Sequence, residues 1–113
     1  MKAIKVSLLL PLTYNDGTDV DGCNTREFLE RIVCLCGGYT SYRAAEGAYT
    51  GQNNQGLMYD RVLPVFVILD WEALDTGKLL QLKSMVVGYG NSLGQETMYW
   101  EAQQVEVAFL PCK

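Results

Sequence analysis

The fold is decided by residues 58–70, which read MYDRVLPVFVILD. Apolar residues occupy every second position from 63 to 69, and a period of two is typical of a β-strand. The positions between them are apolar as well, because Val62, Phe66 and Ile68 surround Pro64. We therefore expect a strand with two apolar faces, of which helices cover one and a second subunit covers the other. Partial burial of the second face by loops is the alternative.

Three further strands are expected around this one. Residues 4–12 alternate in the same way, and residues 39–48 form a second strand, followed by a loop at residues 51–56. The last strand spans residues 96–110, where the apolar positions change from even to odd numbers. A bulge at residues 103–104 would explain this change.

Two helices separate the strands. Asn24 is the expected N-cap of the first, since an acidic residue three positions later gives a capping box, and Gly37 follows its last turn. The second helix spans residues 74–89 and ends at Gly90. The resulting β-α-β-β-α-β order predicts an α+β, ferredoxin-like fold, an antiparallel sheet with two helices on one face, as a single domain over residues 1–113.

Composition excludes several classes of function. A net charge of −4 with scattered lysine and arginine argues against a nucleic-acid-binding protein. No apolar stretch has the length of a membrane span, and residues 1–12 lack the cleavage site of a signal peptide. We expect a cytoplasmic protein whose cysteines are reduced structural thiols. These are Cys23, Cys34, Cys36 and Cys112.

The absence of histidine restricts the chemistry. Ser-His, Cys-His and histidine–metal sites cannot form within this chain. The acidic segment at residues 15–22, NDGTDVDG, invites comparison with an EF-hand calcium loop. However, Val20 then falls where an oxygen ligand is needed, and Asp21 where the sharp turn needs glycine. We interpret Asp16, Asp19 and Asp21 as solvated turn residues and expect no metal or cofactor.

A set of tyrosines and acids remains as candidate ligand contacts. Carboxylates suit amines, ribose hydroxyls and cations, while tyrosine rings attract cations and the phenol donates hydrogen bonds. Most of the set lies near residues 58–70. It comprises Tyr39, Tyr42, Glu46, Tyr49, Tyr59, Asp60, Asp70, Glu72 and Glu96.

Four segments together resemble small phage-encoded S-adenosylmethionine (SAM) lyases. They read LLLPLTYNDG, GGYTSYRAAEGAYTG, MYDRVLPVFVILDWE and GQETMYWE, and with the element order they cover nearly the whole chain. The resemblance implies a ferredoxin-like trimer with active sites between subunits. It also implies cleavage of SAM to 5′-methylthioadenosine and L-homoserine lactone by the substrate's own carboxylate. In the host cytoplasm this reaction would deplete the methyl donor of restriction–modification systems.

The same resemblance implies a tyrosine and a glutamate near the substrate. Tyr59 matches the tyrosine, and Asp70 stands where the glutamate is expected, with Glu72 close behind. We take Tyr59 and Asp70 as the candidate catalytic residues. The candidate substrate-binding residues are Glu72, Tyr42, Glu46, Tyr49 and Glu96.

Spacing gives a first view of how such a site is built. At about 3.3 Å per strand residue, Tyr59 and Asp70 lie roughly 35 Å apart in one chain, so a shared site needs two subunits. We expect the first and third strands to run parallel at the sheet centre, which sorts the candidates between the two ends of the sheet. Those expected at one end are Tyr14, Tyr42, Asp70 and Glu96, and those at the other are Glu46, Tyr49 and Tyr59.

Other interpretations stay open. The polar stretch at residues 46–61 lines an intersubunit cleft, or it is a hairpin connection whose polarity reflects solvent. A non-catalytic ferredoxin-like oligomer would bind a nucleoside or amino-acid effector and release no product. A structural or inhibitory phage protein would bind a host enzyme, although the small, unclustered charge disfavours an acidic mimic. Hydrolysis of SAM by water is a further outcome of the same site.

Overall fold

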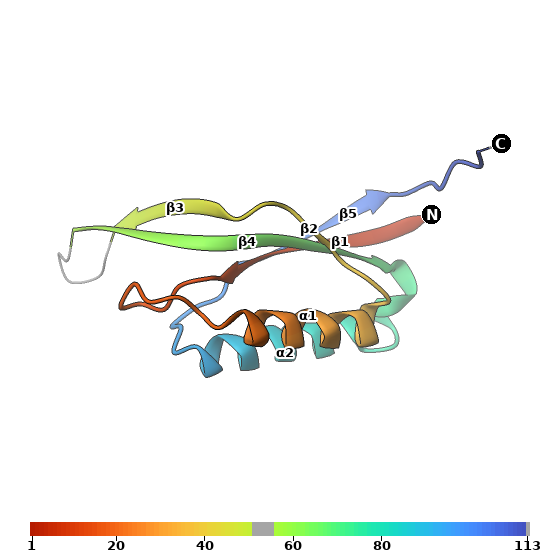
Figure 1. The fold of residues 1–113 in the computed structure, drawn as a ribbon. Helices are drawn as coiled ribbons and strands as arrows, with labels where there is room; N and C mark the ends of the chain where they lie inside the picture. The colour runs from red at the N-terminus through yellow and green to blue at the C-terminus, as the bar shows by residue number, and fades with distance from the viewer. Residues whose placement is uncertain (51–55, 113) are drawn as a thin grey trace.

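The computed structural model describes residues 1–50 and 56–112. In chain order the elements are β1 (Lys2–Pro11), α1 (Gly22–Cys36), β2 (Thr40–Ser41), β3 (Ala45–Thr50), β4 (Leu57–Asp70), the 3₁₀ helix η2 (Trp71–Leu74), α2 (Lys78–Ser92) and β5 (Trp100–Glu106). Strand pairings among the described residues are antiparallel, in the order β2-β4-β1-β5, with β3 also paired to β4. Both helices lie along one face of this sheet (Figure 1), so the α+β, ferredoxin-like prediction is confirmed.

The hydrophobic core lies between that face and the helices. Phe28 of α1 stacks on Tyr89 of α2 with ring centroids 4.3 Å apart, which joins the two helices. Burial raises the pKa of the Tyr89 phenol, and the nearby Thr25 hydroxyl, 3.4 Å away, opposes part of this effect. Every second residue of β1 and of the second half of β4 points into this layer, as the strand period predicts. The buried side chains include Ile4, Val6, Leu8, Leu10, Ile32, Val65, Val67, Leu69, Leu82 and Val86.

The two central strands run antiparallel, so the expected parallel arrangement is wrong. Ala3 pairs with Asp70, and Pro11 pairs with Val62. The crossover through α1 returns the chain in the direction of β1, and the β3–β4 hairpin then reverses it, so β4 must oppose β1. As a consequence Asp70 lies beside the start of β1, at the end of the sheet away from Tyr14.

The expected second strand is broken into β2 and β3. Tyr42 donates its backbone N–H to the Pro64 carbonyl at 2.9 Å, which puts these two residues opposite each other. Ala45 already pairs with Val62, so residues 43 and 44 face a single residue of β4. This extra residue is a bulge. Pro64 has no N–H to offer to the ladder, and bulges are one of the places where a sheet accepts proline.

The last strand is shorter than expected and carries no bulge. β5 pairs with β1 in one continuous register over its whole length, so the bulge expected at residues 103–104 is wrong. The change of parity has another cause, because β5 carries apolar side chains on both faces. Trp100 packs against the core, whereas Val105 lies on the opposite face of the sheet.

α1 begins earlier than expected, because Asp21 rather than Asn24 is its N-cap. The Asp21 carboxylate accepts a hydrogen bond from the Cys23 N–H at 2.9 Å, which satisfies one of the free donors of the first turn. At the other end, Gly37 adopts the left-handed conformation with φ 90°, as the sequence predicts.

α2 continues through Gly90, where the sequence predicted its end. Glycine at this position allows Met98 to pack closely against the helix, since a Cβ at residue 90 would lie 2.5 Å from Cγ of Met98. The left-handed residue behind the helix is Gly94, with φ 69°. The expected start at residue 74 belongs to η2. Within the two described stretches, no helix combines the length and apolar character needed to cross a membrane.

Replacing Gly37 by alanine is expected to lower the free energy of unfolding by about 1 kcal/mol, because an L side chain strains the left-handed cap. Gly38→Ala is the matched control, since no positive φ occurs at Gly38 and a Cβ there meets no atom within 4 Å. Urea denaturation measures both variants. Equal losses at the two positions would show that the cap geometry has no special cost.

Cys36 is the one cysteine for which burial has a chemical consequence. Burial raises the pKa of its thiol, and the charge of Lys78 offsets part of this rise. Because the thiolate is the reactive form, we expect Cys36 to react with iodoacetamide at pH 8 more slowly than the exposed Cys23, Cys34 and Cys112. Mass spectrometry of peptides after timed alkylation measures the rates. A Cys36 rate equal to the others would be evidence against this burial.

Candidate functional site

The β3–β4 hairpin carries Tyr59 and extends beyond the rest of the sheet. β1 pairs with β4 as far as Val62, and one further hydrogen bond joins the Leu12 N–H to the Arg61 carbonyl at 2.9 Å. Residues 57–60 continue the ladder with β3, and Figure 1 shows the hairpin reaching past both helices. Tyr59 is 75% exposed there. Its ring and hydroxyl are therefore available to a ligand or to another chain.

Cross-strand pairing divides the hairpin side chains between two faces. Glu46 pairs with Arg61 and Ala48 pairs with Tyr59. Glu46 and Tyr59 are therefore diagonal neighbours on the face that continues into the helix side of the sheet. Tyr49 lies on the other face, because it is one residue out of phase with Ala48. The structure thus brings Glu46 and Tyr59 together on one face of the hairpin and places Tyr49 on the other.

Asp60 lies against the backbone of Gly47 on that other face. A Cβ at residue 47 would stand 2.8 Å from Oδ1 of Asp60, so glycine leaves the space that the carboxylate occupies. Sequence reasoning named Asp60 and missed Gly47. The available signal was a glycine in the interior of an expected strand, which often marks a close approach of other atoms.

Asp70 and Glu72 lie at the opposite end of the sheet from Tyr59. Asp70 pairs with Ala3 and directly precedes η2, which contains Glu72. Both acidic residues are exposed. The Lys2 ammonium lies 5.8 Å from the centroid of the Trp71 ring, so a cation and an aromatic surface accompany the two acids.

The structure does not bring Tyr59 and Asp70 together within one chain. β4 is extended from one residue to the other, and at about 3.3 Å per residue their separation is roughly 35 Å. A small substrate cannot touch both residues of the same subunit. Any site that uses both takes them from two chains.

Tyr42 follows the edge strand β2 and lies opposite Pro64, on the face of the sheet away from the helices. Its ring is 5.8 Å from the Phe66 ring, and the Lys5 ammonium lies 4.5 Å from the Phe66 centroid. Sequence reasoning missed Lys5, although its alternation with the buried β1 residues places it on this face. Several apolar side chains of the same face are only half-buried. These are Leu9, Val62, Pro64, Phe66 and Ile68.

Glu96 lies at the Tyr14 end of the sheet and therefore far from Asp70, although the two were expected together. Asn15 donates to the Gly94 carbonyl at 3.3 Å, and the Gln95 side chain donates to Asn15 Oδ1 at 3.3 Å. Glu96 contributes to a cavity of about 440 Å³ between α2 and the segment leading into β5. We call this cavity the α2–β5 groove; its walls include Lys83, Val86, Val87, Met98 and Trp100.

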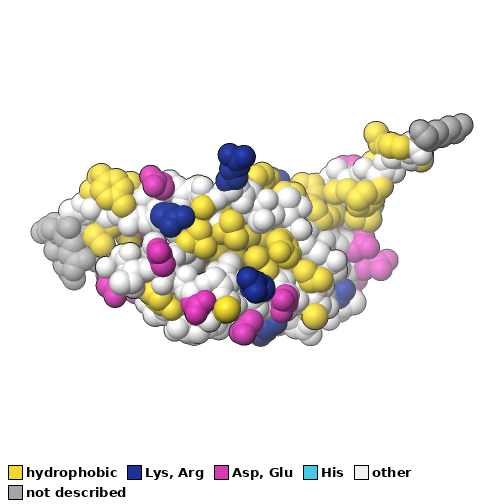
Figure 2. All heavy atoms as spheres, viewed as in Figure 1, with side chains coloured by type: hydrophobic (Ala, Val, Ile, Leu, Met, Phe, Trp, Pro, Cys, Tyr) yellow, Lys and Arg dark blue, Asp and Glu magenta, His cyan; other side chains and the backbone are white. Residues whose placement is uncertain are grey.

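A second hollow, of about 500 Å³, lies beside α1. β2 is only two residues long, and Figure 2 shows hydrophobic side chains gathered where the sheet edge meets the helix layer. Tyr39, one of the candidate tyrosines, contributes to this hollow and is 40% exposed. The other apolar lining residues are Leu12, Val20, Leu29 and Val33.

The acidic loop before α1 has turn and capping roles. The Thr18 hydroxyl donates to Oδ1 of Asp16 at 2.6 Å and its N–H at 2.9 Å, and these bonds lower the pKa of the Asp16 carboxyl. Asp21 caps α1, and Asp19 lies 3.9 Å from the Arg61 guanidinium. Among residues 1–50 and 56–112, no group of three or more acids or cysteines is arranged to hold a metal ion.

Comparison with known proteins gives matches at the level of the fold. A phage SAM lyase solved in complex with S-methyl-5′-thioadenosine has a TM-score of 0.64 and 16% identity, over 90% of this chain and 81% of that one. CutA1 from the psychrotrophic bacterium Shewanella has a TM-score of 0.67 and 14% identity, over 95% and 84% of the two chains. The divalent cation tolerance protein CutA1 of Thermus thermophilus has a TM-score of 0.57 and 14% identity, over 98% and 88%.

These similarities show a shared fold. No protein-family model matches the sequence, and no curated protein matches it. At identities of 14–16%, the fold does not by itself assign chemistry, because one fold hosts many functions. The assignment of a function therefore depends on the site residues of this chain.

Proposed function

We propose that this chain is a SAM lyase that works as a homotrimer, with each active site formed between two subunits. The observation that carries the proposal is the placement of Tyr59 and Asp70 at opposite ends of one extended strand. The fold shared with a phage SAM lyase supports the same assignment.

Two features of the single chain support assembly. The hairpin that carries Tyr59 reaches past the body of the sheet, and residues 57–60 have β3 as their strand neighbour there. The sheet face away from the helices carries half-buried apolar side chains such as Leu9 and Phe66. A neighbouring subunit would bury this face and bring one chain's hairpin toward another chain's Asp70.

The chemistry suits a site without histidine. A carboxylate oxygen of SAM attacks its own γ-carbon, the C–S bond breaks, and the sulfonium leaves as neutral methylthioadenosine while the lactone ring closes. Nucleophile and leaving group both belong to the substrate, so the protein has to fold the substrate and place charge around it. No strong base is needed.

In this proposal Tyr59 and Asp70 have different tasks. The Tyr59 hydroxyl would contact the reacting sulfonium region, and the Asp70 carboxylate would bind the substrate ammonium. Glu46 would accompany Tyr59, because the two share a face of the hairpin, and Glu72 would accompany Asp70. Tyr42 and Tyr49 lie on the sheet face away from the helices, and Glu96 lines the α2–β5 groove. Their role in substrate binding stays a prediction.

The biological consequence would be loss of the methyl donor. A phage-encoded lyase in the host cytoplasm would lower SAM below the level that restriction–modification enzymes need.

A second candidate function is compatible with the same fold, which CutA1 shares. A ferredoxin-like oligomer without catalysis would use the same intersubunit cleft to bind a nucleoside or amino-acid effector. Such a protein would bind SAM or adenosine and return the ligand unchanged.

Incubation of the purified protein with SAM, followed by mass spectrometry, tests the proposal. We expect equal amounts of methylthioadenosine and homoserine lactone at the earliest times. Homoserine from the outset, without lactone, would identify water as the nucleophile and reject the lyase. Intact SAM in the presence of a folded oligomer would favour the effector-binding candidate.

A further inference from the structure

The segment that follows β5 projects from the molecule with two large apolar side chains. Phe109 and Leu110 are 86% and 80% exposed. Figure 1 shows residues 107–112, here called the tail, leading away from both the sheet and the helices. These two neighbouring side chains form a small exposed apolar surface on the projecting segment, which another surface could cover.

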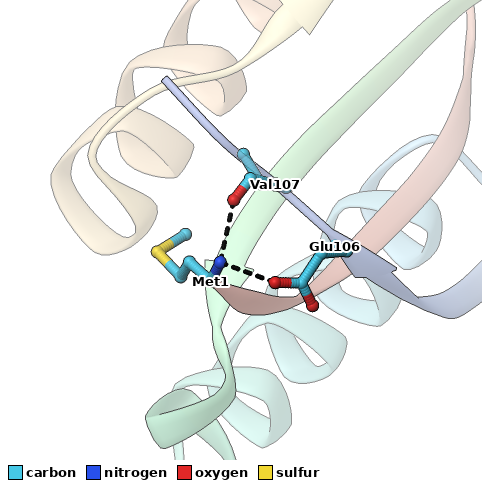
Figure 3. Close-up of polar contacts among 3 residues, drawn as sticks. All are labelled: Met1, Glu106 and Val107. Atoms are coloured by element: carbon cyan, nitrogen blue, oxygen red, sulfur yellow. Dashed lines mark hydrogen bonds and ion pairs between the residues drawn. The ribbon is translucent and has the colours of Figure 1, made fainter. Parts of the chain in front are cut away.

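The root of the tail is fixed. The Val107 N–H donates to the Met1 carbonyl at 2.9 Å, and the Met1 ammonium donates to the Val107 carbonyl at 2.9 Å. The same ammonium forms an ion pair with Oε1 of Glu106 at 2.9 Å (Figure 3). These contacts hold Val107 in line with β5, so the tail leaves the sheet in a defined direction.

The α2–β5 groove has the character of a complementary surface. Its inner wall is apolar, from Val86, Val87, Met98 and the ring of Trp100. Lys83 stands at its rim with the ammonium 5.5 Å from the centroid of the Trp100 ring. A volume of about 440 Å³ accommodates two side chains of the size of phenylalanine and leucine.

The tail cannot reach the groove of its own chain. The groove touches β5 at Trp100, which lies about 23 Å from Val107 along the strand at about 3.3 Å per residue. A fully extended chain from Val107 to Leu110 spans at most about 11 Å. Since the root of the tail is held in line with β5, a tail that fills this groove must come from a second molecule.

We propose that Phe109 and Leu110 of one copy dock into the α2–β5 groove of a second copy. Phe109 would pack against Trp100 and Met98, where aromatic and sulfur contacts are favourable. The tail residues around the pair, from Val107 to Pro111, carry no charge and match the apolar wall. This interaction is separate from the proposed active site, since it uses neither the hairpin nor Asp70.

The emission of Trp100 reports on the groove directly. The sequence contains two tryptophans, so Trp71→Phe leaves Trp100 as the only reporter. In this background, Phe109→Ser with Leu110→Ser is expected to shift the Trp100 emission to longer wavelength, because the ring loses its apolar cover. Leu80→Ser is the matched control, since Leu80 is 70% exposed on α2 and does not line the groove. Unchanged emission in the tail variant would overturn the proposal.

A mixing experiment separates docking between copies from any contact within one chain. The tail variant with its Trp100 reporter is refolded together with a tryptophan-free donor, Trp71→Phe with Trp100→Phe, that keeps an intact tail. We expect the donor to restore the shorter-wavelength emission in proportion to its share, and a donor carrying both serine substitutions to restore none. Failure of the intact donor to restore the emission would overturn docking in a second copy. Circular dichroism verifies that each variant folds, and neither result depends on SAM cleavage.

Discussion

Tyr59→Phe and Asp70→Asn are each expected to lower the rate of SAM consumption about 100-fold, which is typical for the loss of one well-placed polar group around developing or disappearing charge. Each substitution keeps the shape of the side chain and removes a hydroxyl or a negative charge. Both residues are exposed in the single chain, so neither change is expected to disturb the fold. Initial rates of methylthioadenosine release measure the effect.

Matched controls separate a local effect from a general one. Tyr99→Phe removes a hydroxyl that donates to Glu101 at 3.0 Å, on a part of the sheet outside the proposed site. Asp75→Asn removes a carboxylate just behind η2. Both controls are expected to keep the parental rate within about twofold, as surface substitutions away from a site do. Parental rates in Tyr59→Phe or Asp70→Asn would remove that residue from the catalytic site.

Phe28→Ala is expected to lower the free energy of unfolding by about 3–5 kcal/mol, the usual range for deleting a buried aromatic side chain. Phe28 is 1% exposed and stacks on Tyr89, so its loss opens a cavity between the two helices. Against a typical total stability of about 5–15 kcal/mol, this is a large fraction.

Val33→Ala on the same helix is the control for Phe28→Ala. Val33 is 42% exposed, and its truncation is expected to cost below about 1 kcal/mol. Urea denaturation followed by circular dichroism measures both variants. Similar losses at the two positions would contradict the burial of Phe28 in the core.

The central strands and the helix faces were predictable from the sequence, because burial requires apolar residues at a regular spacing along each element. This spacing does not depend on where the element begins or ends. The alternation from Ile4 and the apolar run around Pro64 both correspond to strands in the sheet centre. Helix ends were less predictable, since Asp21 and Asn24 are equally good caps locally. Gly90 packs against Met98, which lies outside the helix, so the local sequence pattern does not predict this contact.

The candidate site was predictable in residue types and only partly in placement. Which face carries Tyr49 or Tyr59 depends on the strand register, and a shift of one residue exchanges the faces. We expected β4 to run parallel to β1, and this placed Asp70 at the Tyr14 end of the sheet, which is wrong. The order of the elements along the chain already implied antiparallel strands. The break between β2 and β3, just after Tyr42, depends on the pairing of this segment with β4 around Pro64. Pairing between two strands cannot be read from a local sequence pattern.

The central claim is that Tyr59 of one subunit and Asp70 of another serve the same active site. Joint refolding of Tyr59→Phe and Asp70→Asn protein in equal amounts tests it most directly. Each site then has an intact tyrosine in half of the cases and an intact aspartate in half, so a trimer is expected to recover about one quarter of the parental activity. Mixed oligomers, verified by native mass spectrometry, that remain as inactive as the separate variants would contradict the claim.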